Sequence, residues 1–387
     1  MPPKNQAAWI VAKKTVPLQV KDAPYKSPGA GQVTVKNGAL AINPFDWVLL
    51  YQAGLLAGHL KYPMVLGTDV AGTVVEVGPG VTRFKVGDRV AGNAVSAGKE
   101  SNDPAEGAFQ LYTVLREHMI AKVPEFVPDE EAAVLGLGVG TASYGLFHKD
   151  YLGLDFPQVP APPNPQPGKK YPRAVIVTGG AASVGSCAVQ LAVSAGYEVF
   201  STSSPKNFEM VKGFGAKAVF DYNSSTLVED LVAALEGYEL CGAYCIGANA
   251  DTVCGSVMQT RLSKSSEPPT RKFCSLAGGA QRDSSFVKGF FGSYRMMSSM
   301  MGMMGKNAIK KMTTGVEVKF IMMTDIVSED GVVSKIYKDF LGPALAERQF
   351  VPSPTPQVVG HGLDKVNEAL DISQKGVSGK KLVVALP

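Results

Sequence analysis

A strand-turn-helix-strand pattern in the middle of the chain constrains the fold more than any other feature. Residues Ala174–Thr178 form an apolar, β-branched run typical of a buried strand, and a glycine-rich turn, Gly179–Gly185, follows directly. Val184–Ala195 then have the composition of a helix, and Glu198–Thr202 that of a second strand. Together these segments span about 30 residues, the size of a βαβ unit. We therefore expect a parallel sheet covered by helices.

The same alternation continues beyond this unit. Further strand-like runs lie at Lys217–Phe220, Gly242–Ile246 and Lys272–Leu276, with helical stretches between them. Strands that alternate with helices indicate a doubly wound parallel sheet, so we predict a Rossmann-type dinucleotide-binding domain.

The first 130 or so residues have a different rhythm. They consist of short strand-like runs punctuated by Gly and Pro, such as Gln32–Lys36 and Gly72–Gly78, which predicts a small, partly closed β domain. The tail contains a helical stretch near Ser334–Arg348 and ends in a strand-like run, Lys380–Leu386. We predict an α/β protein whose first domain comprises residues 1–137 and 320–387 and whose second comprises 138–319.

The glycine-rich turn has the spacing Gly-x-Ala-x-x-Gly, with Ala182 in place of the middle glycine of the dinucleotide fingerprint. Its outer glycines permit a tight turn and close helix packing, and backbone amides at the helix start would face a pyrophosphate. A plain strand-to-helix turn is the alternative. The surrounding βαβ context favours the cofactor site.

The end of the second strand distinguishes between the two nicotinamide cofactors. An NAD site places Asp or Glu there to bind the ribose 2′-hydroxyl, whereas this chain has Ser201–Lys206. Ser204 can donate a hydrogen bond and Lys206 supplies positive charge to a 2′-phosphate, which favours NADPH. The alternative for Lys206 is an ordinary solvated lysine. Tyr222 is a second candidate for the phosphate or adenine, with edge packing as its alternative.

Composition excludes several classes of partner. The 387 residues are 45% hydrophobic and 19% charged, which suits two buried cores, and the net charge of +4 comes from scattered Lys and Arg. We expect a small-molecule ligand and no nucleic acid. All five cysteines follow position 186, no run is apolar enough to span a membrane, and the first residues lack a secretory signal. A soluble protein of the cytoplasm is expected.

No metal site is expected in the first domain. A catalytic zinc needs three Cys, His or carboxylate ligands, but the first 186 residues contain no cysteine. His59, His118 and His148 have no ligand partner at a short spacing and are interpreted as surface or packing residues.

The segment Asn43-Pro44-Phe45-Asp46 has two interpretations. Asn43 as N-cap, Pro44 in the first helical position and Asp46 as a carboxylate that reaches back would start a helix. Alternatively, this helix start faces the nicotinamide, and Asn43 or Asp46 polarises or positions the substrate. Tyr51 is a possible proton donor, with aromatic packing as its alternative.

In combination and order, seven segments resemble the medium-chain dehydrogenase/reductase superfamily over essentially the whole chain, and within it the zinc-free quinone-oxidoreductase-like and fungal trans-acting enoyl-reductase-like branch. These segments are Ala41–Trp47, Leu66–Gly72, Phe84–Val90, Gly107–Tyr112, Gly179–Gly185, Ser204–Phe208 and Val377–Val383. The resemblance implies a GroES-like, partly closed β-barrel catalytic domain and a Rossmann domain that binds NADPH.

The resemblance also implies which residues hold the cofactor. Thr141 should lie near the nicotinamide carboxamide, and Gly180, Ala181, Ala182, Ser183 and Val184 should form the pyrophosphate turn. Ser204, Lys206, Asn207 and Tyr222 should hold the 2′-phosphate and adenosine, and Ile246, Leu276, Ala277, Val377 and Ser378 should line the nicotinamide end.

Two positions separate this chain from other members. Zinc-containing relatives have His-Glu where this chain has Thr68-Asp69, which agrees with the expected absence of metal. Fungal members often have Asp-Trp-Lys, whereas Val48 follows Asp46-Trp47 here. This departure bears on the substrate class and on catalytic roles carried over to this helix.

The function expected is hydride transfer from NADPH to an activated C=C bond of a small, apolar enone or enoyl substrate, with hydrogen-bond donors stabilising the enolate. Quinone reduction is the near alternative, and carbonyl reduction, with Tyr51 as proton donor, is more distant. A non-catalytic NADPH-binding redox sensor is an alternative of another class. Action on carrier-tethered intermediates stays open, and the protein is expected to be a monomer or homodimer.

Six methionines cluster near an aromatic run, Phe286–Tyr294. Methionine adapts to irregular apolar surfaces, so the cluster could line a substrate pocket, shape a subunit interface or belong to an ordinary core helix. Its members are Met296, Met297, Met300, Met301, Met303 and Met304.

Overall fold

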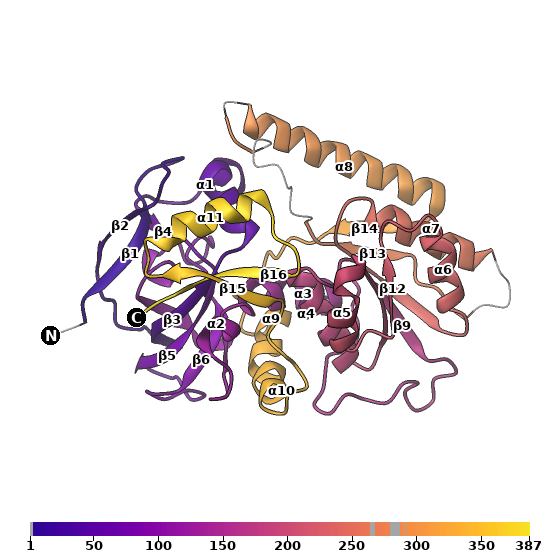
Figure 1. Ribbon diagram of the computed structural model, residues 1–387, viewed down its shortest axis with the longest axis horizontal. Helices are drawn as coiled ribbons and strands as arrows, with labels where there is room; N and C mark the ends of the chain where they lie inside the picture. Colours follow the sequence, from indigo (N-terminus) through magenta and orange to yellow (C-terminus); the bar gives the residue numbers. More distant parts are fainter. Residues whose placement is uncertain (1–2, 264–267, 279–286, 290) are drawn as a thin grey trace.

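The computed structural model describes residues 3–263, 268–278, 287–289 and 291–387. Two α/β parts lie side by side, one built on a mostly antiparallel sheet and one on a parallel sheet, with helices between them (Figure 1). Within the described residues, no helix is long and apolar enough to cross a membrane.

The parallel sheet has six strands in the order β11-β10-β9-β12-β13-β14. Counted from β9, this is the order 3-2-1-4-5-6 of a doubly wound dinucleotide-binding fold, which confirms the predicted fold class. The strands are β9 (Arg173–Val177), β10 (Glu198–Ser203), β11 (Ala218–Asp221), β12 (Glu239–Cys245), β13 (Phe273–Leu276) and β14 (Glu317–Phe320). The connecting helices are α4 (Ser183–Ser194), α5 (Phe208–Gly213), α6 (Leu227–Ala234), α7 (Ala250–Leu262) and α8 (Gly292–Thr314).

The other part holds a seven-stranded sheet in which β15, β16, β3, β5, β6 and β8 follow one another and β7 pairs with β3, together with a small sheet of β2, β1 and β4. The strands are β1 (Asn5–Ile10), β2 (Gln19–Ala23), β3 (Gln32–Ala41), β4 (Met64–Val65), β5 (Asp69–Val77), β6 (Arg89–Asn93), β7 (Tyr112–Arg116), β8 (Ile120–Lys122), β15 (Thr355–His361) and β16 (Lys380–Ala385). Its helices are α1 (Pro44–Leu56), α2 (Asp129–Ala132) and α11 (Lys365–Lys375).

The C-terminal strand β16 is antiparallel to β3 and brings the tail of the chain back to the first sheet. The domain limits given above stay a prediction. The two parts are joined through α3 (Gly136–Phe147), α9 (Val332–Lys335), a π-helical turn (Ile336–Leu341) and α10 (Gly342–Ala346).

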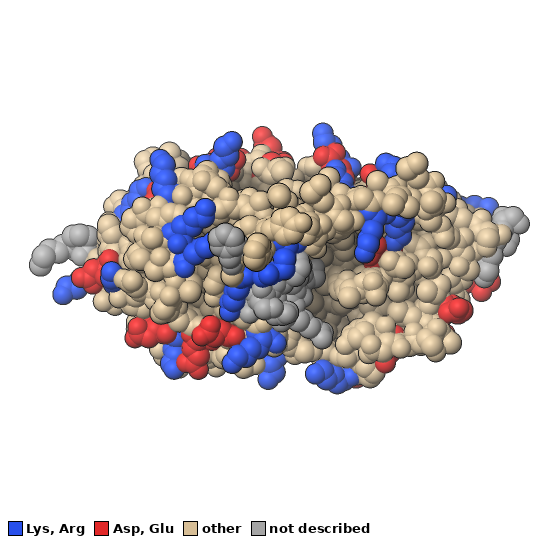
Figure 2. All heavy atoms as spheres, turned by 90° about the horizontal axis from the view of Figure 1, so that it is seen from above, with Lys and Arg blue, Asp and Glu red and all other residues tan. Residues whose placement is uncertain are grey.

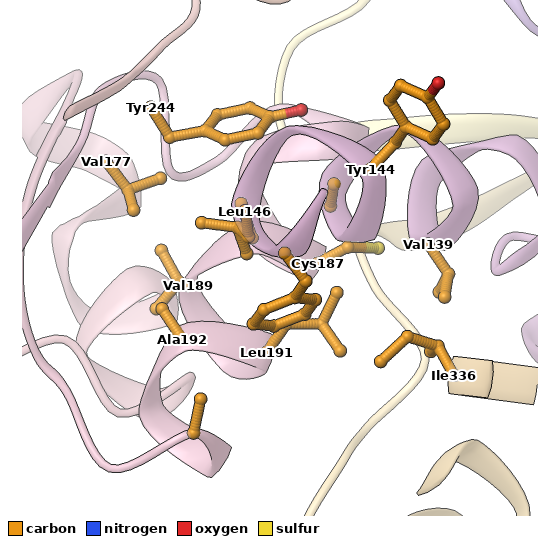
Figure 3. Packing of buried hydrophobic residues seen from close by; sticks show 14 of the residues in the cluster. Val139, Tyr144, Leu146, Val177, Cys187, Val189, Leu191, Ala192, Tyr244 and Ile336 are labelled. Carbon is orange, nitrogen blue, oxygen red and sulfur yellow. The ribbon is translucent and has the colours of Figure 1, made fainter. Parts of the chain in front are cut away.

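Helix α3 packs on α4 and joins the core of the parallel sheet. Val139 and Leu146 of α3 lie close to Cys187 and Leu191 of α4, and all four are fully buried (Figure 3). Small residues on α3 permit this approach, because a Cβ at Gly138 would lie 3.1 Å from the Ser183 hydroxyl. The start of α4 therefore packs closely against α3, which fixes its position.

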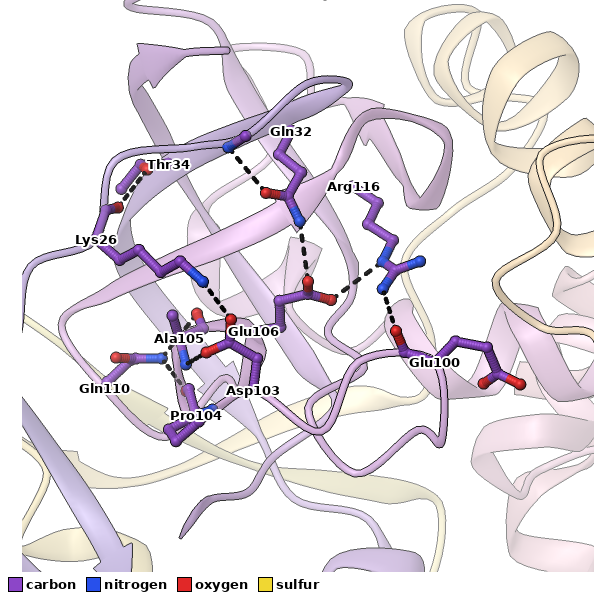
Figure 4. Close-up of polar contacts among 11 residues, drawn as sticks. Lys26, Gln32, Thr34, Glu100, Asp103, Pro104, Ala105, Glu106, Gln110 and Arg116 are labelled. Carbon is purple, nitrogen blue, oxygen red and sulfur yellow. Dashed lines mark hydrogen bonds and ion pairs between the residues drawn. The ribbon is translucent and has the colours of Figure 1, made fainter. Parts of the chain in front are cut away.

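A buried carboxylate, Glu106, organises the loop before β7. It accepts hydrogen bonds from Gln32 Nε2 at 2.9 Å and from Arg116 Nε at 3.1 Å (Figure 4). Glu106 is only 5% exposed, so these donors replace the water that its charge would otherwise bind. The loop leads into Gly107, which packs tightly on the backbone of Val65.

The methionine cluster lies on α8, a long helix that runs along the outer edge of the molecule (Figure 1). Met297, Met301 and Met304 are 49%, 67% and 67% exposed. An ordinary core helix is therefore the wrong interpretation, because a core helix would bury this face. Of the aromatic run, Phe286 and Phe290 lie outside the described residues.

Candidate functional site

The cofactor residues expected on the parallel sheet gather where its strands end. The glycine-rich turn follows β9, Ser204 follows β10 and Ile246 follows β12, and Leu276 is the last residue of β13. Since parallel strands share one carboxyl edge, these residues lie at the same edge of the sheet, at the point where the strand order reverses between β9 and β12.

The turn between β9 and α4 is shaped for close approach by a ligand. Gly179 has φ of 65°, which favours glycine, and a Cβ at Gly185 would overlap the carbonyl oxygen of Gly179. Ala182 is the N-cap, and no side chain of the described residues caps α4 there. The first amides of α4 are therefore available to an anion.

The expected 2′-phosphate end forms a polar surface at the end of β10. Asn207 Nδ2 donates to Ser204 Oγ at 3.0 Å, and the side chain of Lys206 is exposed beside them. Tyr222 is half exposed and its amide donates to the carbonyl of Ser203 at 3.4 Å, which places it next to the same strand end.

The loop that precedes β16 reaches this surface from the other part of the molecule. Val377 and Ser378 are exposed there, and a Cβ on the next residue, Gly379, would lie 3.1 Å from Asn207 Oδ1. The structure therefore places this loop next to Asn207, at the expected 2′-phosphate end, whereas the resemblance implies that Val377 and Ser378 line the nicotinamide end.

The expected nicotinamide end is tied to the glycine-rich turn by hydrogen bonds. Thr178 Oγ1 accepts from the Ile246 amide at 2.7 Å and donates to its carbonyl at 2.9 Å. The Ala277 amide donates to the carbonyl of Cys245 at 3.0 Å, and the carbonyl of Thr141 accepts from the Tyr244 hydroxyl at 3.0 Å. Strand ends and α3 are thereby fixed relative to one another.

Helix α1 begins as the sequence predicts. Asn43 is the N-cap, Pro44 occupies the first turn, and Asp46 Oδ2 accepts a hydrogen bond from the Asn43 amide at 2.7 Å. Burial raises the pKa of Asp46 to about 8, although the bond from Asn43 opposes the shift. Among the described residues, Asp46 Oδ1 has no hydrogen-bond partner.

A chain of hydrogen bonds runs from Asn43 to the start of α4. Asn43 Nδ2 donates to Thr68 Oγ1 at 2.9 Å, and Thr68 Oγ1 donates to Asp69 Oδ1 at 3.1 Å. Lys381 Nζ pairs with Asp69 Oδ2 and also donates to Ser183 Oγ at 3.3 Å. The two helix starts expected to bind substrate and cofactor are therefore physically linked.

Asp69 and Lys381 were missed as candidate site residues. Both are almost completely buried, and Asp69 also accepts from the Leu137 amide at 2.7 Å, while Lys381 donates to the Val134 carbonyl. A signal was present, because an apolar strand run follows each of them directly, Val70-Ala71 after Asp69 and Leu382–Ala385 after Lys381, and an unpaired charge would be costly there. Sequence alone did not show that the two charges meet.

Tyr51 lies two turns further along α1. Its ring is half buried with Lys288 Nζ 5.0 Å from the ring centroid, and it lines a surface pocket beside Leu55 and Ser293. The structure therefore does not bring Tyr51 into the hydrogen-bond chain that includes Asn43. In the part of the chain that the structure describes, no three His, Cys, Asp or Glu residues form a group that could hold a metal ion.

Comparisons with known proteins agree with this geometry. The alcohol dehydrogenase GroES-like domain family matches residues 29–125. The chain is 43% identical over 387 residues to the dehydrogenase pigH of Monascus ruber, across 99% of this chain and 100% of that protein. This protein belongs to the medium-chain dehydrogenase/reductase family. Reductases of the family use nicotinamide cofactors, so the protein is an oxidoreductase with a nicotinamide site.

Other medium-chain reductases resemble the chain less closely. The trans-enoyl reductase himH of Aspergillus japonicus is 32% identical over 385 residues, across 99% of this chain and 97% of himH. The solved structure of CurK enoyl reductase matches with a TM-score of 0.67 at 19% identity and covers both chains completely, which shows the fold. The GroES-like and Rossmann parts expected from the sequence are confirmed.

Proposed function

We propose that this medium-chain reductase transfers a hydride from NADPH to an activated C=C bond of a small, apolar enone or enoyl substrate, without a metal ion. The observation that most supports the proposal is the hydrogen-bond chain from Asn43 to Ser183. It joins a buried amide donor on the substrate side to the helix start on the cofactor side.

The residues present fit a dinucleotide. The uncapped first turn of α4 offers backbone amides to a pyrophosphate, and Gly179 and Gly185 leave space for its close approach. NADPH bound there would supply the hydride. Thr141, Ile246, Leu276 and Ala277 would line its nicotinamide end, and Gly180–Val184 its pyrophosphate.

The preference for NADPH rests on the end of β10. Ser204 and Asn207 are hydrogen-bonded to each other, and Lys206 is exposed beside them, so two polar groups and a cation are available to a 2′-phosphate. No carboxylate stands at Ser201–Lys206, where an Asp or Glu would repel that phosphate.

The environment of Asp69 supports chemistry without a metal. Asp69 would have to supply a ligand oxygen, but Oδ1 accepts from Thr68 and Leu137 and Oδ2 is paired with Lys381. The ammonium group of Lys381 at this carboxylate would also repel a divalent cation. The polar groups around Asp69 therefore suit a structural ion pair better than zinc.

Without a metal, the enolate oxygen needs hydrogen-bond donors. The carboxamide of Asn43 has two N–H groups, and Thr68 accepts only one of them. We assign the second to the substrate carbonyl, with Asp46 acting on Asn43 as a positioning residue through the helix cap. Tyr51 is two turns away from Asn43, so it is not assigned a proton-transfer role.

A substrate screen with both nicotinamides tests the proposal. Purified protein should oxidise NADPH faster than NADH in the presence of enones, and the product should be the saturated ketone. An allylic alcohol would instead indicate carbonyl reduction, and turnover of quinones alone would indicate a quinone reductase. NADPH binding without turnover of any substrate would support a redox sensor. Cytoplasmic location and a monomeric or homodimeric state stay predictions.

A further inference from the structure

The surface pocket beside Tyr51 lies where α1, the turn before β2 and the start of α8 meet. It has a volume of about 220 Å³ and is lined by Lys13, Lys14, Tyr51, Gly54, Leu55 and Ser293. At the edge of the pocket, Lys288 Nζ lies over the Tyr51 ring, 5.0 Å from its centroid. Figure 2 is viewed from the α8 side of the molecule and shows Lys and Arg side chains exposed on that face.

Positive charge is concentrated at this pocket. Lys13, Lys14 and Lys288 bring three amines to it, and its lining includes no Asp or Glu among the residues that the structure describes. None of the three lysines forms an ion pair within the described part of the chain. Like charges repel one another, so an arrangement of this kind is stabilised by an anion between them.

Specific backbone geometry and hydrogen bonds fix the walls of the pocket. Lys14 has φ of 61°, a left-handed conformation that is uncommon outside glycine, and a Cβ at Gly54 would overlap the Lys13 amine. On the opposite side, buried Gln52 donates to the Val287 carbonyl and accepts from Ser293 Oγ at 2.8 Å. Backbone geometry and a buried amide therefore fix both walls.

The same helix connects the pocket with the proposed reaction site. Val48, Tyr51 and Leu55 follow one another at spacings of three and four residues and lie on one face of α1. Tyr51 is eight residues beyond the N-cap Asn43, which corresponds to about 12 Å along a helix axis. This face is apolar between its two ends, so it suits the aliphatic part of an extended substrate.

We propose that the pocket is a subsite for an anionic oxygen group, phosphate or carboxylate, at the far end of the substrate from its C=C bond. This inference rests on the proposed function, because it takes α1 as one wall of the substrate path. The three lysines bind the oxyanion, and the ring of Tyr51 packs against the chain that leads to it.

Three matched substrates test this subsite. They share one enone and one alkyl chain and end in a carboxylate, a phosphate monoester or an alcohol. The wild-type protein should prefer one or both anionic substrates over the alcohol in kcat/KM by about tenfold, since a charged hydrogen bond contributes about 1.5 kcal/mol. Which anion is preferred distinguishes a carboxylate from a phosphate substrate.

The variants K13A/K14A and K288A should reduce that preference to about twofold or less. The variant K169A/K170A is a matched control, because it removes two adjacent, exposed lysines from a segment of loop far along the chain, and it should leave the preference unchanged. A wild-type protein with equal kcat/KM for all three substrates would overturn the inference, even if it reduces the enone.

A binding measurement separates this result from failure of the proposed function. The saturated form of each compound is titrated calorimetrically into the protein with NADP⁺ present in excess. Tighter binding of the anionic compounds, lost in K13A/K14A and kept in K169A/K170A, supports the subsite even if no substrate turns over. Equal binding of all three compounds contradicts it.

Discussion

Lys381 Nζ lies 3.3 Å from Ser183 Oγ while the same amine is paired with Asp69. These residues come from the last strand of the chain, the first turn of α4 and the start of β5. A single ammonium group thus joins the GroES-like part to the helix that would hold the pyrophosphate. Any motion of one part relative to the other must stretch or break these contacts.

Loss of this ammonium group should destabilise the fold. Lys381→Met leaves the buried carboxylate of Asp69 without its counter-ion, which should reduce the free energy of unfolding by about 3 kcal/mol. Urea denaturation followed by circular dichroism measures the change. The double variant D69N/K381M should recover part of the loss, and K380A, at the exposed neighbour, should be neutral. A K381M protein with the same free energy of unfolding as the wild type would show that the Asp69–Lys381 pair contributes little to stability.

Substitution of Lys206 should change cofactor preference. Lys206→Ala removes the cation expected at the 2′-phosphate, so Kd for NADPH should rise by about tenfold while Kd for NADH, which lacks that phosphate, stays the same. Fluorescence titration of the reduced cofactors measures both constants. Lys212, which is exposed and paired with Glu209, provides the control variant K212A. Unchanged NADPH affinity in K206A would remove Lys206 from the site.

Asp46 should make stability depend on pH. Its pKa rises from 3.8 to about 8 in the folded state, so between these values the unfolded chain binds fewer protons than the folded one. The free energy of unfolding should therefore fall as pH rises, by at most about 1.4 kcal/mol per pH unit. Asp46→Asn keeps an acceptor for the Asn43 amide but cannot ionise. The difference in free energy of unfolding between wild type and D46N therefore isolates the contribution of the Asp46 charge. A difference that stays flat from pH 5 to 8 would contradict the shift.

The stability of the protein should depend on the charge of Glu106, which organises the loop before β7. Glu106→Ala leaves Arg116 without its carboxylate and Gln32 without an acceptor, which should reduce the free energy of unfolding by about 2 kcal/mol. Glu106→Gln keeps one acceptor and should lose less. Thermal denaturation compares both variants with the wild type, and an E106Q transition temperature equal to that of the wild type would show that the charge is unimportant.

Much of the fold followed from local sequence patterns. The runs before Gly179 and Gly196 lie within a residue or two of β9 and α4, because a buried parallel strand is continuously apolar and glycine ends both elements. The cap at Asn43 was also predictable, since its determinants lie within four residues. Strand β14 was missed because Glu317 and Lys319 interrupt its apolar character.

Long-range polar contacts could not be predicted in the same way. Asp69 and Lys381 are 312 positions apart, and a single sequence does not show which buried charge meets which. The pocket at Tyr51 likewise combines a turn, a helix and the start of α8, so the sequence showed Tyr51 only as a possible proton donor. The methionines of α8 were ambiguous because the helical period does not show which face is covered.

Hydride transfer to the β-carbon of the C=C bond, and not to the carbonyl carbon, can be tested in one labelling experiment. An α,β-unsaturated ketone is incubated with the protein and NADPH that carries deuterium on the transferred position of C4, and the product is examined by NMR. The expected product is a saturated ketone with deuterium on the β-carbon. An allylic alcohol with deuterium on the former carbonyl carbon would contradict it.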